Sequence, residues 1–143
     1  MYTNILIATD GSDRAGNAAR HEVSLAKSTG TKITALNVSQ PYHWFAPNMV
    51  PDAQAAYAQE QNQAATVALS VIADLAKSVG VAVETMHVEG EHPSGVIIDT
   101  AKAKNCDLIV MGSHGRRGIS AVILDSETAK VLTHSTIPVL VCR

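Results

Sequence analysis

The chain has 143 residues, of which 46% are hydrophobic and 17% charged, so it is long enough and apolar enough to bury the core of one domain. Its formal charge of −2, with 11 basic and 13 acidic residues, argues against a nucleic-acid or membrane-surface binder, which would carry a basic excess. Two cysteines without a CxxC pair argue against a disulfide scaffold and a cysteine-based zinc site.

The first half of the chain predicts strand, helix, strand. A continuous apolar run followed by Asp10-Gly11-Ser12 is typical of a strand buried on both faces. Alanines and valines at helical spacing come next, and Gly30 ends that helix. The predicted elements are a strand at 4–9, a helix at 13–29, a strand at 32–38 and a proline-containing loop at 39–52.

The second half repeats the alternation. Ala65, Leu69, Ile72, Ala76 and Val79 recur at steps of three and four and predict one face of a helix that Gly80 ends. Pro93 suits the first turn of the next helix. The predicted elements are a helix from about 53, a strand at 81–88, a helix at 93–105, a strand at 107–111, a glycine-bearing loop at 112–118, a helix at about 126–134 and a strand at 138–142.

This alternation predicts a single α/β domain over residues 1–143, with a parallel sheet covered by helices on both faces. No basic leader precedes the first apolar run and no uninterrupted apolar stretch approaches 18 residues, so we expect a cytoplasmic protein without a membrane partner.

In open α/β sheets, ligands bind beyond the carboxyl ends of the strands. The most informative such segment is Gly112-Ser113-His114-Gly115-Arg116-Arg117-Gly118. Its glycines let backbone N–H groups approach a ligand, and its arginines suit phosphate. The alternative interpretation is a turn with a solvated basic tip. No P-loop or dinucleotide fingerprint is present.

Other candidates carry two interpretations each. Asp10 could hydrogen-bond a base amino group or cap the next helix, and His114 could neighbour a ligand or be solvated. The aromatic residues within 42–45 could cover the crevice, contact a partner or pack back over a helix. The six histidines lack metal-binding spacing, so no metal site is expected, and no catalytic serine motif is visible.

The sequence resembles the universal stress protein family. The matching stretches cover the chain in order: ILIATDGS (5–12), GEHPSGVIIDTA (90–101), CDLIVMGSHGRRG (106–118), and the segment 126–143 that ends in PVLVCR. The resemblance implies a Rossmann-like five-stranded parallel sheet in the order 3-2-1-4-5. It also implies a stress-response homodimer that pairs through the last strand, 138–142.

The ATP-binding branch of that family carries the pattern G-x2-G-x9-G-[S/T]. By this resemblance, Asp10 and Val38 lie at the adenine, and Ser126 meets phosphate. The expected residues near the ribose and the glycine loop are Met111, Gly112, His114, Gly115 and Arg116.

The third glycine of the pattern is replaced by Asp125, and Glu127 adds a second carboxylate beside Ser126. A helix N-terminus binds anions through free N–H groups, but an aspartate there accepts those N–H groups itself. Two like charges 4 Å apart also repel by about 1 kcal/mol in water and about 4 at an effective dielectric of 20. We therefore expect weakened ATP binding, with an AMP-like or ADP-like ligand retained. Bridging Mg²⁺ (with ATP only) or charge offset by Arg116 and Arg117 would rescue ATP binding.

Three functions remain open from the sequence. The first is a nucleotide-responsive stress protein that acts through an unknown protein partner. The second is a nucleotide-free dimeric interaction module, in which Asp125 closes the phosphate site. The third is a slow ATPase or autophosphorylating protein, for which Ser126 and Thr128 are the nominal acceptors.

Overall fold

The computed structural model describes residues 1–41, 50–112 and 126–143, apart from the side chains of Asp13 and Arg14. Its strands form one parallel sheet in the order β3-β2-β1-β4-β5, which confirms the α/β prediction and the expected strand order. The strands are β1 (Asn4–Ala8), β2 (Lys32–Ser39), β3 (Val83–Glu89), β4 (Leu108–Gly112) and β5 (Val139–Cys142). The helices are α1 (Asp13–Thr29), α3 (Pro51–Ser78), α4 (Pro93–Ala103) and α5 (Ser126–His134).

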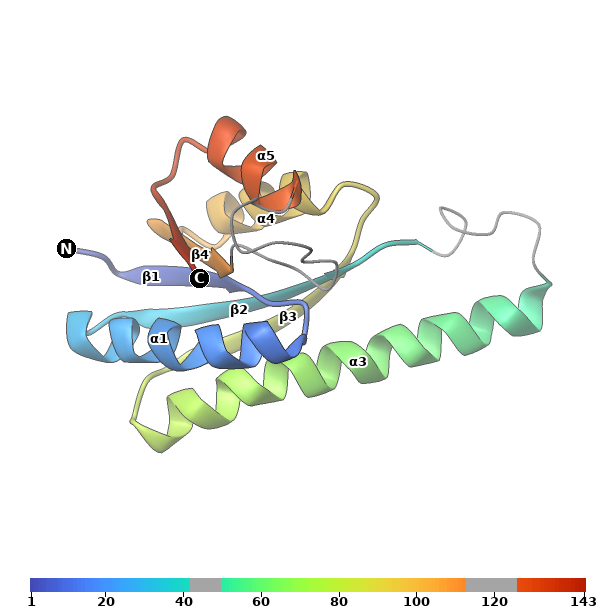
Figure 1. Cartoon of the computed structure of the whole chain (residues 1–143), viewed down its shortest axis with the longest axis horizontal. Coiled ribbons are helices and arrows are strands. Elements are labelled where there is room, and N and C mark those ends of the chain that lie inside the picture. Colours follow the sequence, from blue (N-terminus) through green and yellow to red (C-terminus); the bar gives the residue numbers. More distant parts are fainter. Residues whose placement is uncertain (42–49, 113–125) are drawn as a thin grey trace.

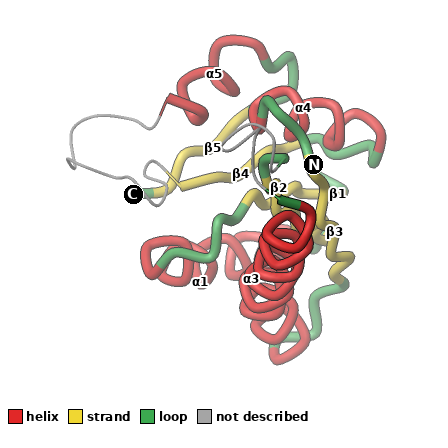
Figure 2. The backbone as a smooth tube through the Cα atoms, turned by 90° about the vertical axis from the view of Figure 1, so that its right-hand side faces the viewer, coloured by secondary structure: helices red, strands yellow, loops and turns green. Residues whose placement is uncertain are grey.

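The helices cover both faces of the sheet. Helices α1 and α3 lie on one face and α4 and α5 on the other (Figure 1), and Figure 2 shows the same two layers from the side. Because successive strand residues point to opposite faces, β1 contributes to two cores. Ile5 and Ile7 pack with α1 and α3, whereas Leu6 packs with α4 and α5.

Local chemistry explains where the helices begin and end. The Ser12 hydroxyl caps α1 by accepting the Ala15 N–H at 3.2 Å, and Gly30 ends that helix at φ 68°. Helix α3 begins at Pro51, slightly earlier than predicted, because proline has no N–H to satisfy at a helix start. Helix α4 ends before the predicted 105, since Asn105 adopts a positive φ of 55°.

Two further details of the prediction were wrong. Val79 does not belong to the buried face of α3; it is the C-cap and is exposed. The third strand begins at Val83 rather than 81, because the Val81 N–H donates to the Ala76 carbonyl and closes the end of α3.

Asp107 fastens the start of β1 to the start of β4. Its carboxylate accepts the backbone N–H groups of Thr3, at 2.8 Å, and Asn4, at 3.2 Å, and also the Thr3 hydroxyl. Burial raises the pKa of Asp107, but these hydrogen bonds outweigh it and hold the pKa below its usual value. The two central strands are therefore held in register at the end opposite to the crevice described next.

Candidate functional site

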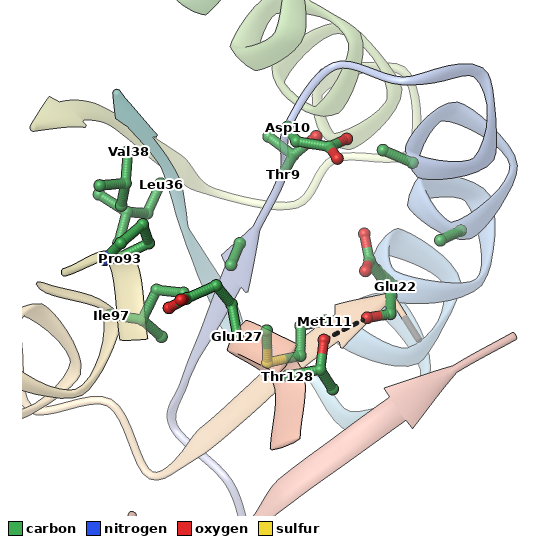
Figure 3. Close-up of a pocket in the computed structure, with 14 residues that line it drawn as sticks. Thr9, Asp10, Glu22, Leu36, Val38, Pro93, Ile97, Met111, Glu127 and Thr128 are labelled. Carbon is green, nitrogen blue, oxygen red and sulfur yellow. Dashed lines mark hydrogen bonds between the residues drawn. The ribbon is translucent and has the colours of Figure 1, made fainter. Parts of the chain in front are cut away.

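A cavity of about 220 Å³ opens at the carboxyl ends of β1 and β4, between α1 on one side and α4 and α5 on the other. These are the central strands at which the strand order reverses, the usual ligand position in open α/β sheets. The lining residues shown in Figure 3 are Ala8, Thr9, Asp10, Ala15, Ala18, Glu22, Leu36, Val38, Pro93, Ile97, Met111, Gly112, Glu127 and Thr128.

Hydrogen bonds fix the segment that leaves β1. The Thr9 carbonyl accepts from the Asn37 side chain at 2.9 Å, which ties this segment to β2. Asp10 accepts the Ser12 N–H through Oδ1 at 2.9 Å, forming a tight turn before α1. Ser12, rather than Asp10, caps the helix, so the capping interpretation of Asp10 was wrong. The Asp10 carboxylate is held at the cavity wall by this turn.

Glu127 joins the two helices on the other side of the cavity. Its Oε2 accepts the Ser94 N–H at 2.9 Å, at the start of α4, and its Oε1 accepts from Lys130 Nζ at 3.2 Å. A carboxylate at a helix N-terminus is stabilised by the free N–H groups and the helix dipole. Part of its charge is thus offset by protein groups.

Thr128 closes the cavity floor beside β4. Its hydroxyl donates to the Gly112 carbonyl at 3.0 Å, and its side chain is buried. This bond fixes the first turn of α5 against the end of β4. The backbone at Gly112 is therefore positioned by α5 as well as by the sheet.

Glu22 reaches the cavity from α1. Its side chain is only 3% exposed, and no hydrogen bond to it occurs among the described residues. Burial alone raises the pKa of Glu22 from 4.5 to about 8, so the group is mainly a neutral acid at pH 7. Figure 3 shows its carboxyl group pointing into the cavity.

The cavity is acidic within the described residues. Three carboxyl groups line it, those of Asp10, Glu22 and Glu127, and no lysine or arginine whose side chain the structure describes does. The remaining wall is largely aliphatic. Such a surface suits a flat apolar group with hydrogen-bond donors better than a polyanion.

The predicted site residues fall into three groups. Asp10, Val38, Met111, Gly112 and Glu127 line the cavity together. Ser126 lies at the exposed start of α5, near the cavity but outside its lining. The predictions for His114, Gly115, Arg116 and Asp125, and for the aromatic residues within 42–45, lie outside the described residues.

Sequence reasoning missed Glu22 and Thr128. A helical count would have found Glu22, which falls four positions after Ala18 and three after Ala19, on the apolar face of α1. A charged residue on such a face is the signal. Thr128 was considered only as a phosphate acceptor, whereas its hydroxyl donates to β4.

Two kinds of site are absent from the parts that the structure describes. No cluster of three or more histidine, cysteine, aspartate or glutamate side chains suitable for a metal ion occurs there. None of the described helices has the length and apolar character needed to cross a membrane.

Comparison with known proteins identifies the family. The sequence profile of the universal stress protein family matches residues 1–143. The chain belongs to this family. It is 32% identical to the universal stress protein YxiE of Bacillus subtilis, covering all of both chains, and 31% identical to the universal stress protein MJ0531 of Methanocaldococcus jannaschii, covering 83% of that protein.

Solved structures of universal stress proteins share the fold. UspA of Lactobacillus plantarum is 32% identical with a TM-score of 0.72, covering 99% of this chain and 98% of the other. The protein MJ0577 is 27% identical with a TM-score of 0.83, covering 99% and 95%. A universal stress protein in complex with cAMP is 26% identical with a TM-score of 0.68, covering 99% and 97%.

Proposed function

We propose that this universal stress protein binds an adenine nucleotide in the cavity beyond β1 and β4 and acts as a regulatory homodimer with a weakened triphosphate site. The observation that carries the proposal is the meeting of Asp10, Val38, Met111 and Gly112 around one cavity at the reversal of strand order. The related structure in complex with cAMP supports an adenine nucleotide as the ligand class.

The aliphatic wall suits the base. Val38 and Leu36 come from β2, Met111 from β4 and Ile97 from α4, so apolar side chains face the cavity from three elements. The Asp10 carboxylate lies in the cavity wall and can accept a hydrogen bond from the exocyclic amino group of a base. An adenine base combines these two demands.

The carboxyl groups disfavour a triphosphate. Asp10 and Glu127 line the cavity and Asp125 precedes α5 in the sequence, whereas Glu22 is mainly a neutral acid at pH 7 and adds little charge there. Lys130 and the α4 N-terminus offset the charge of Glu127 in part. We therefore favour AMP, or another ligand with few phosphates, over ATP, with Mg²⁺ entering only together with ATP.

Isothermal titration with adenosine, AMP, ATP and Mg-ATP tests the proposal. Asp125→Gly is expected to raise ATP affinity by about tenfold or more, the equivalent of about 1.4 kcal/mol. Asp125→Asn, which removes the charge but keeps a residue type that is able to cap a helix, is expected to give part of that gain. Equal Mg-ATP affinity in wild type and Asp125→Gly contradicts the weakened triphosphate site.

The nucleotide-free alternative is separated by what the purified protein carries. Heat denaturation releases any bound small molecule, and mass spectrometry identifies it. An adenine nucleotide in the supernatant supports the proposal. Absence of a released nucleotide, together with no heat of binding for any of the four ligands, favours the interaction module instead.

The proposed homodimer uses the edge strand β5. This strand ends the sheet and pairs only with β4 among the described strands, and Leu140 on it is exposed. Leu140→Asp is expected to convert a dimer to a monomer in sedimentation experiments. Leu132→Asp on α5, a comparably exposed leucine outside the edge strand, is the matched control. An unchanged dimer in Leu140→Asp contradicts this interface.

A further inference from the structure

Among the described residues, no hydrogen bond or ion pair satisfies the buried carboxyl group of Glu22. It sits on the third turn of α1, among Ala18, Ala19 and Val23, which pack toward the sheet. Buried polar groups are normally hydrogen-bonded, and an unmet one costs stability. The side chain faces the cavity in Figure 3, where a ligand would supply the missing partner.

The charged and titratable groups facing Glu22 are few within the described residues. Asp10 and Glu127 line the same cavity from the β1 turn and from α5. His21, Cys142 and Arg143 line a second cavity on the other side of Glu22, towards β5. Burial, and then the charge of Glu22, raise the pKa of Cys142. None of these groups forms a hydrogen bond or an ion pair with Glu22 in the part of the chain that is described.

We propose that Glu22 is a ligand-contacting residue that determines specificity: its carboxylic acid donates a hydrogen bond to an acceptor oxygen of the bound nucleotide, and its ionised form excludes anionic nucleotides. This inference rests on the proposed function and assigns the site a contact from α1. The partner atom is a phosphate or ribose oxygen, because the acid offers one O–H donor towards the cavity.

Burial keeps this acid protonated at neutral pH, so the crevice tolerates a phosphate there. As the pH rises through about 8, the proton leaves and a negative charge faces the ligand. Binding of AMP then requires proton uptake, whereas adenosine carries no charge to repel. The residue thus couples nucleotide affinity to pH.

Two substitutions of Glu22 distinguish a side chain that contacts the ligand from one that is only buried. Glu22→Gln keeps the shape and an N–H donor but cannot ionise, and Glu22→Leu fills a similar volume without any donor. Glu60→Gln, on the exposed surface of α3, is the matched control. Circular dichroism checks that each variant is folded before titration.

The experiment is isothermal titration of AMP and adenosine at pH 7 and pH 9, where the AMP phosphate stays ionised. Wild type and Glu60→Gln are expected to lose up to about tenfold in AMP affinity between these pH values, because the protonated fraction of Glu22 falls by about that factor, and Glu22→Gln less than about twofold. Adenosine affinity is expected to change less than AMP affinity in wild type. Glu22→Leu is expected to bind AMP about tenfold more weakly than Glu22→Gln at pH 7.

The experiment distinguishes failure of the Glu22 inference from failure of the proposed function. AMP binding that is insensitive to pH in wild type and equal in Glu22→Leu overturns the inference and leaves the proposed function standing. No binding of either ligand to wild type at either pH overturns the proposed function, and the inference with it. Carbon NMR of the Glu22 carboxyl, assigned by its loss in Glu22→Gln, should show its pKa rising further when AMP binds.

Discussion

Replacing Glu22 by glutamine is expected to stabilise the protein increasingly as the pH rises. In the unfolded chain the carboxyl ionises near its ordinary pKa of 4.5, whereas in the folded protein burial raises the pKa to about 8. The unfolded state therefore releases a proton that the folded state keeps. The contribution of Glu22 to wild-type stability is therefore full below about pH 4.5 and is lost as the pH rises towards about 8.

The magnitude follows from the two pKa values. Each pH unit between them removes about 1.36 kcal/mol from the free energy of unfolding. At pH 7 wild type has lost about 3 kcal/mol, and above about 8 the loss reaches about 5 kcal/mol. Because the side chain is 3% exposed, solvent screening reduces this little. Glutamine, which is neutral in both states, avoids the loss.

Urea unfolding of wild type, Glu22→Gln and the exposed control Glu60→Gln, followed by circular dichroism from pH 5 to pH 9, measures the effect. The gap between wild type and Glu22→Gln should widen by several kcal/mol over this range, while Glu60→Gln follows wild type. Parallel curves for Glu22→Gln and wild type would refute the reasoning, because they would mean that the buried acid ionises freely in the folded state.

Three smaller predictions concern the turn before α1, the start of the sheet and the cavity floor. Gly11→Ala should cost about 1–3 kcal/mol more than Gly30→Ala. Both glycines have positive φ, but only at Gly11 would a Cβ stand 2.9 Å from a methyl group of α3; equal urea midpoints would contradict this. Asp107→Ala should cost about 0.5–1.5 kcal/mol by removing the hydrogen bonds to the N–H groups at the start of β1, with exposed Asp99→Ala as control. The wild-type contribution of Asp107 should fade as the pH falls through its lowered pKa, seen as a steeper acid unfolding than in Asp107→Ala. Thr128→Val should weaken AMP binding severalfold by releasing the Gly112 carbonyl, and unchanged titrations would argue against that role.

Fold and site differ in how far the sequence could predict them. Strand and helix positions followed from apolar periodicity, which is local, so α1 and α5 were predicted with correct bounds. The ends of α3 and α4 were less accurate because Pro51 and Asn105 act through backbone conformation rather than apolarity. The strand order came from the family resemblance, because periodicity does not reveal which strands are neighbours.

Contacts between distant segments were beyond local patterns. Nothing in the sequence around Glu127 indicates that its carboxylate reaches Ser94, 33 residues away, at the start of another helix. The Asp107 carboxylate likewise accepts hydrogen bonds from the backbone N–H groups of Thr3 and Asn4, about a hundred residues earlier in the chain. Glu22 was missed for a different reason. Its place on the apolar face of α1 can be read from the spacing of the sequence alone, without any distant contact.

The bridge from Glu127 to Ser94 means that α4 and α5 share one fastening point at the rim of the crevice. Any occupant that draws this carboxylate away would loosen the first turns of two neighbouring helices together. An event at the pocket would then reach the starts of both helices at once, without bending the sheet beneath.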